Sequence, residues 1–85
     1  SSLVTNARLT RIYPNPSSTS FFVESSNGEI LSVELRDALG KLVRRKELSG
    51  SQNVLEMDLN SILPGIYMLK VLTESGWHDH RLVVQ

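Results

Sequence analysis

The sequence contains no cysteine, which excludes a disulfide framework, a thiol nucleophile and a thiolate metal site. Its nine basic and nine acidic residues cancel to a formal net charge of zero, so no long-range field recruits nucleic acid, a membrane surface or an acidic substrate. No apolar run approaches the roughly 18 residues of a membrane span, and the first residues lack the charged and apolar regions of a signal peptide. If the chain is exported, its address lies upstream in a longer polypeptide or is the domain itself.

Side chains able to do chemistry are also scarce. There is no Gly-x-Ser-x-Gly elbow, and the only histidines are His78 and His80, which flank Asp79. Residues two apart on a strand share a face, so the two imidazoles are placed to bind the same metal ion. Closed zinc sites, however, need four ligands. We therefore expect a solvated edge strand here, and we predict no catalytic residue, no metal ligand and no cofactor.

The aromatic residues are few. Sandwich-type carbohydrate modules usually expose several coplanar aromatic rings, whereas most of the rings here are better assigned to a core. The five aromatics are Tyr13, Phe21, Phe22, Tyr67 and Trp77.

The chain has no credible amphipathic helix; it has instead about seven short apolar or alternating runs separated by turn signals. The expected strands span 8–13, 21–24, 31–37, 41–48, 54–59, 68–72 and 77–84. This pattern predicts an all-β, immunoglobulin-like antiparallel sandwich with Greek-key connections. At 85 residues the chain is one domain, which buries only about 60 to 65% of its unfolded surface.

The alternation predicts which side chains face the core. Leu31, Val33 and Leu35 should share one face of their strand. In the later run 54–59, the buried face should carry Leu55, Met57 and Leu59.

Four turn signals punctuate these strands. The prolines of 14–16 remove two backbone donors, so this tripeptide is expected to be a rigid loop. The Asn-Gly pair in 25–28 indicates a hairpin turn. In 37–40, Asp37 should accept backbone N–H bonds while Gly40 takes the left-handed position of a G1 bulge. The fourth, 74–76, is a tight turn.

A corner at 62–67 organises the rest of the chain. Pro64 and Gly65 suit the central positions of a type II turn. Tyr67 follows two residues later, as in the tyrosine corner of Greek-key sandwiches, so its hydroxyl should bond a carbonyl near Ile62 or Leu63. The alternative is that Tyr67 is an ordinary half-buried strand aromatic.

A basic cluster occupies one strand. It consists of Lys41, Arg44, Arg45 and Lys46. Its residues either contact an anionic polymer or a partner protein, or protect an edge strand from sheet addition by their charge. No aromatic residues are interleaved with them for stacking, which favours the protected edge.

Four motifs in the same order resemble the type A C-terminal sorting domain of type IX secretion, also called Por secretion. They are 13–16 (Tyr-Pro-Asn-Pro), 37–43 (Asp-Ala-Leu-Gly-Lys-Leu-Val), 59–67 (Leu-x-x-Ile-Leu-Pro-Gly-Ile-Tyr) and 81–84 (Arg-Leu-Val-Val). The resemblance covers 9–85 and leaves 1–8 as a polar linker from an upstream cargo. The positions that match the family motif are Pro14, Asn15, Pro16, Asp37, Gly40, Lys41, Pro64, Gly65 and Tyr67.

The resemblance implies a recognition signal rather than an enzyme. In that family the domain ends a larger cargo protein that crosses the inner membrane by an ordinary signal peptide. The outer-membrane translocon then recognises the folded sandwich. A sortase-like surface protease removes the domain and can join the cargo to an anionic lipopolysaccharide. For this chain the resemblance implies export through the periplasm to the cell surface or medium, cleavage in or just before 1–7, no direct membrane insertion and no nucleic acid partner.

The end of the chain departs from the family pattern. Family members commonly end on or next to a basic residue, whereas the last basic residue here is Arg81, which leaves open whether Gln85 is the native C-terminus. We hypothesise that the final strand carries the signal, because a terminus on an edge strand offers unpaired backbone to a partner by β-addition. Its residues are Arg81, Leu82, Val83, Val84 and Gln85. The alternative, which is compatible with this, is that Leu82 and Val84 pack in the core.

Two rival functions follow from the same residues. One is an accessory adhesive or carbohydrate-binding sandwich attached to a secreted hydrolase. The other is a small metal-dependent enzyme that uses His78 and His80.

Overall fold

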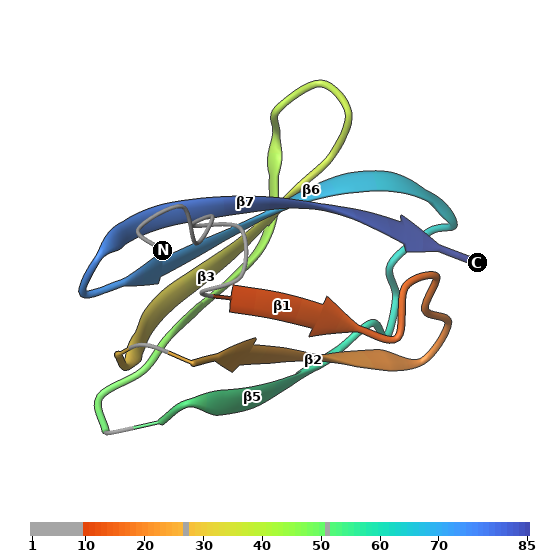
Figure 1. The fold of residues 1–85 in the computed structure, drawn as a ribbon. Helices are drawn as coiled ribbons and strands as arrows, with labels where there is room; N and C mark the ends of the chain where they lie inside the picture. The colour runs from red at the N-terminus through yellow and green to blue at the C-terminus, as the bar shows by residue number, and fades with distance from the viewer. Residues whose placement is uncertain (1–9, 27, 51) are drawn as a thin grey trace, which may run out of the picture.

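The computed structural model describes residues 10–26, 28–50 and 52–85. Within these residues, seven strands form two antiparallel sheets, with strand orders β1-β2-β5 and β4-β3-β6-β7. The strands are β1 (Thr10–Tyr13), β2 (Ser20–Ser25), β3 (Ile30–Arg36), β4 (Leu42–Glu47), β5 (Val54–Asp58), β6 (Gly65–Thr73) and β7 (Gly76–Val84). Figure 1 shows the sheets as two layers, with β6 and β7 above β1, β2 and β5. The all-β, immunoglobulin-like sandwich is confirmed, and the described part of the chain contains no apolar helix long enough to cross a bilayer.

The core lies between the layers and is built from alternate residues of each strand. Leu55, Met57 and Leu59 are buried as expected. Leu82 and Val84, near the end of the chain, are also buried. The full set of buried apolar residues is Phe21, Val23, Ile30, Val33, Leu35, Leu55, Met57, Leu59, Tyr67, Leu69, Val71, Leu82 and Val84.

The predicted face of β3 is wrong at its first position. Leu31 is 37% exposed, whereas Ile30 and Ser32 on either side of it are buried. The cause is a register shift between Ile30 and Ser32 in the pairing of β3 with β6. Because one extra residue reverses the alternation, Leu31 faces solvent, and the buried Ser32 hydroxyl has no hydrogen-bond partner among the described residues.

The predicted hairpin at 25–28 is also wrong, because β2 and β3 belong to different sheets. Both edges of β2 are already occupied, by β1 on one side and β5 on the other. The Ser25 hydroxyl donates to the Gly28 carbonyl (2.8 Å), and the Ile30 N–H bonds the Gln52 carbonyl across the crossover (2.9 Å). Asn27, at the centre of the expected turn, lies outside the described residues.

The aromatic residues divide between core and surface, so assigning most of them to the core was wrong. Phe21 and Tyr67 are buried, whereas Trp77 is 51% exposed. Phe22 follows Phe21 and therefore faces the other way, where its ring stacks on Tyr13 with centroids 5.5 Å apart. The guanidinium of Arg11 lies 4.8 Å from the centre of the same Tyr13 ring.

Candidate recognition site

The outer edge of β7 is closed near the C-terminus by the loop after β1. The Asn15 side chain donates to the Arg81 carbonyl (2.7 Å) and accepts from the Val83 N–H (3.0 Å). Ser17 continues the ladder: its N–H donates to the Val83 carbonyl (2.9 Å), and its carbonyl accepts from the Gln85 N–H (2.8 Å). We call Asn15 and Ser17, with these bonds, the terminal clamp.

The terminal clamp contradicts the reason given for β-addition at the last strand. β7 is an edge strand, but its outward backbone groups from the Arg81 carbonyl to the Gln85 N–H are already paired. An asparagine amide has both a donor and an acceptor, so it pairs with a carbonyl and an N–H two residues apart as a neighbouring strand would. The 14–16 loop is thus more than a rigid spacer, because its Asn15 pairs with the edge of β7. The sequence did not predict this pairing, since the bonded residues are 66 and 68 positions apart in the chain.

The loop between β3 and β4 has the conformation expected of it. The Asp37 carboxylate accepts the N–H groups of Leu39 and Lys41, both at 2.9 Å. The Gly40 N–H bonds the Asp37 carbonyl (2.9 Å), and Gly40 has φ of 87°, in the left-handed region. The loop stands out from the sandwich in Figure 1 and carries Leu39 at its tip, 94% exposed.

The tyrosine corner is confirmed, but the turn beside it is misplaced. The Tyr67 hydroxyl donates to the Leu63 carbonyl at 2.6 Å. The hydrogen-bonded turn lies earlier, where the Ile62 N–H bonds the Leu59 carbonyl (3.0 Å) and Ser61 has φ of 68°. The Asp58 carboxylate starts this turn by accepting the Asn60 N–H (2.6 Å), as short polar side chains do in turns. Gly65 is already the first residue of β6.

Replacing Tyr67 by phenylalanine should lower the free energy of unfolding by about 1 to 2 kcal/mol, because it removes one partly buried hydrogen bond and leaves the Leu63 carbonyl without its donor. Urea denaturation of both proteins measures the difference. The ring itself is retained, so the fold should persist. An unchanged urea midpoint would show that the hydroxyl contributes nothing to the corner.

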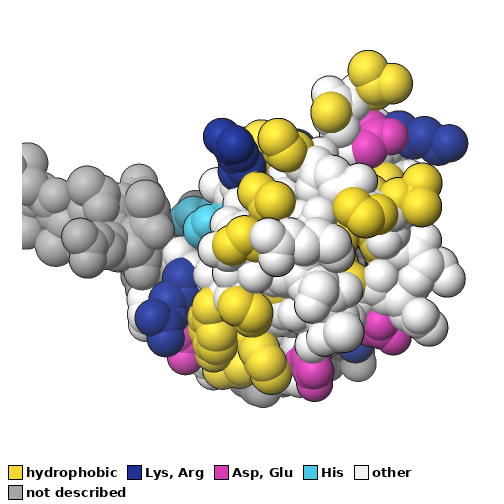
Figure 2. Space-filling view, turned by 90° about the vertical axis from the view of Figure 1, so that its right-hand side faces the viewer, with side chains coloured by type: hydrophobic (Ala, Val, Ile, Leu, Met, Phe, Trp, Pro, Cys, Tyr) yellow, Lys and Arg dark blue, Asp and Glu magenta, His cyan; other side chains and the backbone are white. Residues whose placement is uncertain are grey.

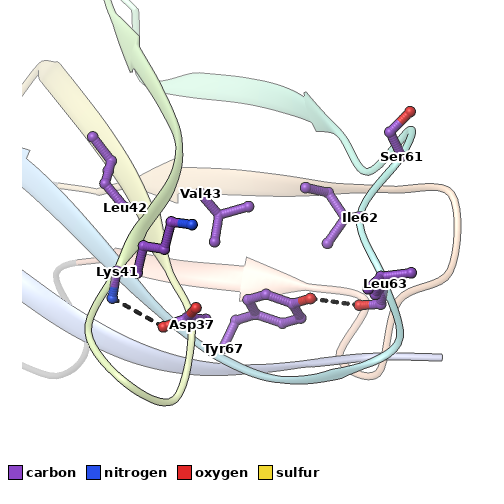
Figure 3. Close-up of a pocket in the computed structure, with 8 residues that line it drawn as sticks. All are labelled: Asp37, Lys41, Leu42, Val43, Ser61, Ile62, Leu63 and Tyr67. Atoms are coloured by element: carbon purple, nitrogen blue, oxygen red, sulfur yellow. Dashed lines mark hydrogen bonds between the residues drawn. The ribbon is translucent and has the colours of Figure 1, made fainter.

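Two of the sequence motifs meet around one hollow of about 350 Å³. In Figure 3, Val43, Ile62 and Tyr67 point toward one another, and the Lys41 side chain extends toward the same space. The residues that line it are Asp37, Lys41, Leu42, Val43, Ser61, Ile62, Leu63 and Tyr67. The hollow is lined by apolar and polar groups alike, with Lys41 as its one lining cation and Asp37 as its one lining anion. Its apolar groups suit an apolar side chain, and Lys41 can face an acidic group beside it.

The remaining motif residues lie elsewhere. Pro14, Asn15 and Pro16 lie beside β7, where Asn15 forms the terminal clamp. Gly40, Pro64 and Gly65 belong to the segments around the hollow but do not line it. Figure 2, which looks onto the right-hand end of Figure 1, shows hydrophobic side chains in separate groups rather than one apolar face.

The two histidines are bonded to hydroxyl groups. His80 Nε2 lies 2.6 Å from Thr10 Oγ1, and His78 Nε2 lies 3.0 Å from Ser75 Oγ and 3.2 Å from Thr73 Oγ1. Among residues 10–26, 28–50 and 52–85, no three His, Cys, Asp or Glu side chains are grouped so as to hold a metal ion.

Burial lowers the pKa of His80 below its usual value of 6.5, and the neighbouring His78 lowers it further against the opposing effect of Asp79. The unfolded chain therefore takes up this proton at a higher pH than the folded domain does. The stability contributed by neutral His80 is fully present above about pH 6.5 and is lost as the pH falls through the folded pKa. We expect the urea midpoint to be lower at about pH 5.5 than at about pH 7.5.

The replacement His80→Gln should make the urea midpoint nearly independent of pH over this range, because glutamine does not titrate. Arg11→Gln, which removes a charge from β1 in the other sheet without removing a hydrogen bond to His80, serves as the control and should keep the dependence. A wild-type midpoint that does not change between the two pH values would contradict the lowered pKa.

A family model described as the secretion system C-terminal sorting domain matches residues 11–85. The chain belongs to this family. It is therefore a type IX secretion sorting signal, the C-terminal tail of a larger cargo protein, with a role in export to the cell surface or medium. The family is one of sorting domains and not of enzymes.

The sorting domain is also similar in fold to solved structures. CopC from Methylosinus trichosporium OB3b aligns with a TM-score of 0.55 and 17% sequence identity, covering 89% of the sorting domain and 93% of CopC. At this identity the likeness concerns the β-sandwich fold alone. No curated protein matches the sequence.

Proposed function

We propose that this sorting domain is recognised as a folded unit by the outer-membrane type IX translocon after its cargo reaches the periplasm. The observation that supports the proposal is the family match over residues 11–85, which spans almost the whole sandwich. A sortase-like protease then cuts in or just before residues 1–7 of the polar linker and releases the cargo or joins it to the cell surface. The linker precedes β1, so a cut there leaves the sandwich whole.

Recognition of a folded unit requires that the unit hold one shape. Two sets of hydrogen bonds stabilise that shape: the terminal clamp at β7 and the tyrosine corner before β6. Both tie loops to strands through specific polar atoms, in a domain too small to rely on a large core. The domain does no chemistry in this proposal; it presents a surface.

The segment 81–85 remains a candidate recognition strand. Because its outward backbone groups are already paired, we propose that its outward side chains make the contact with the partner. Leu82 and Val84 are buried, whereas Arg81 is exposed and Val83 is half-buried on the outer face. We propose that Arg81 and Val83 contact the translocon, together with the outward residues of β6 that pair with them, Met68 and Ile66. Ile66 is 51% exposed and Met68 is 39% exposed.

A reporter experiment tests the outward face separately from folding. The double variant Arg81→Ala/Val83→Thr changes only outward side chains and should fold with a nearly normal urea midpoint, because Arg81 is exposed and threonine keeps the β-branched shape of the half-buried Val83. Fused to a periplasmic reporter in a host with type IX secretion, it should be exported less than the wild type. The control Ser18→Ala/Thr19→Ala changes two exposed loop residues and should be exported normally. Normal export of the 81/83 variant would remove the candidate recognition strand from the proposal.

A further inference from the structure

The two open sides of the sandwich are not alike. On one side, the terminal clamp and the bond between Thr10 and His80 tie the first loop and β1 to β7. On the other side, β4 and β5 are the sheet edges and do not pair with each other. Two hollows lie along this second side, the one of about 350 Å³ beside Tyr67 and one of about 220 Å³ between Arg44–Lys46 and Glu56–Asp58.

Arg44 connects β4 to the corner between β5 and β6 on this open side. Its guanidinium donates to the Asp58 carbonyl (2.8 Å) and the Asn60 carbonyl (2.9 Å). These bonds hold the start of the β5–β6 corner at a fixed position relative to β4. Independently of these bonds, no residue of β4 is buried, and the strand lies beside both hollows.

The backbone of β4 offers an unused hydrogen-bonding edge. Within the described residues β4 pairs with β3 alone, and none of its six residues is buried. The Leu48 N–H bonds the Leu31 carbonyl, so alternation along the ladder directs the N–H and C=O groups of Arg45 and Glu47 outward. No described backbone group pairs with them from that side.

The charge on this edge selects its partner. The cluster Lys41, Arg44, Arg45 and Lys46 carries four of the nine basic residues of the chain. A second copy would bring cations opposite cations, which disfavours pairing of the domain with itself. An extended segment with acidic side chains would instead place carboxylates opposite these cations, which favours pairing. Arg45 already pairs with Glu47 and Glu34, whereas no described carboxylate pairs with Lys41 or Lys46.

We propose that β4 is a docking edge at which an acidic, extended segment of a translocon protein adds as a fifth strand, with one of its apolar side chains in the hollow beside Tyr67. The identity of the partner as part of the export machinery rests on the proposed function. The edge itself is argued from the unpaired backbone of β4, its charge and the adjoining hollow.

The decisive variant is Arg45→Pro, compared with Arg45→Thr. Both remove the same charge, but only proline removes the outward N–H, and proline is tolerated on the free side of an edge strand. In the reporter assay we expect Arg45→Thr to be exported within about twofold of the wild type and Arg45→Pro at least about tenfold less, since main-chain bonds carry the affinity in strand addition. Near-ultraviolet circular dichroism checks that each purified variant is folded.

A second pair tests the charge and does not depend on proline. Lys46→Glu changes the net charge by −2 on the docking edge, and Ser18→Asp/Thr19→Asp makes the same change on the exposed loop between β1 and β2 of the other sheet. Only Lys46→Glu should lose export.

Equal losses for Arg45→Thr and Arg45→Pro would overturn strand addition in favour of an anionic polymer that reads charge alone. Wild-type export of folded Arg45→Pro, or of Lys46→Glu, would also overturn the proposal. Failure of the wild-type fusion to be exported would instead contradict the proposed function itself.

Discussion

Replacing Asn15 by aspartate should lower the free energy of unfolding by about 2 kcal/mol, because the side chain loses its donor to the Arg81 carbonyl and sets a carboxylate oxygen against that carbonyl. Repulsion should also weaken the bond from the Val83 N–H. The end of β7 is then expected to open, so the Val83 and Gln85 amides should exchange with deuterium faster than those of β6. Asn15→Ala, which removes both bonds without adding charge, should have a smaller effect in the same direction.

The matched control for this change is Asn53→Asp. Asn53 also donates its side-chain amide to a carbonyl, that of Gly28 at 3.1 Å, but it does not touch β7. It should leave exchange at Val83 and Gln85 unchanged. If Asn15→Asp also leaves these two amides protected, the terminal clamp is not what holds the C-terminal strand.

Removing residues 82–85 should unfold the domain. Leu82 is fully buried and Val84 is 3% exposed; deleting a buried leucine side chain alone costs about 2 to 5 kcal/mol. The truncation adds the loss of Val84 and of the bonds from Val83 and Gln85 to the terminal clamp. The total is comparable to the whole stability of a small domain, about 5 kcal/mol.

Thermal unfolding followed by circular dichroism measures this effect, and we expect no cooperative transition in the truncated chain. A transition within a few degrees of the wild type would show that the last strand is dispensable for folding. Loss of export on truncation would therefore reflect loss of the fold, and the outward variant Arg81→Ala/Val83→Thr is the one that addresses recognition.

Local patterns of this sequence predicted the strands and two of the loops. Alternation located the buried face of β5, and the spacing from Asp37 to Gly40 predicted both the carboxylate bonds and the positive φ. The bond of Tyr67 to the Leu63 carbonyl was predictable for the same reason, since its partners are four residues apart. In each case the determining interactions lie within a few residues of one another.

The errors arose where distant residues decide the outcome. A register shift buried Ser32 and exposed Leu31, and nothing in the local pattern marks it. The segment after β2 could not form a hairpin because β1 and β5 already occupy both sides of that strand. The contact of Asn15 with β7 joins opposite ends of the chain, so single-sequence reasoning described Asn15 only as part of a proline-rich loop.

The most direct test of the central claim fuses residues 1–85 to a periplasmic reporter and compares a host that has type IX secretion with the same host lacking its translocon. We expect the reporter at the cell surface or in the medium of the first host, cut in or just before residues 1–7, and retained in the periplasm of the second. Protease accessibility on intact cells locates the reporter, and mass spectrometry locates the cut. A reporter that stays in the periplasm of both hosts, although the domain is folded, would contradict the assignment of this sandwich as an export signal.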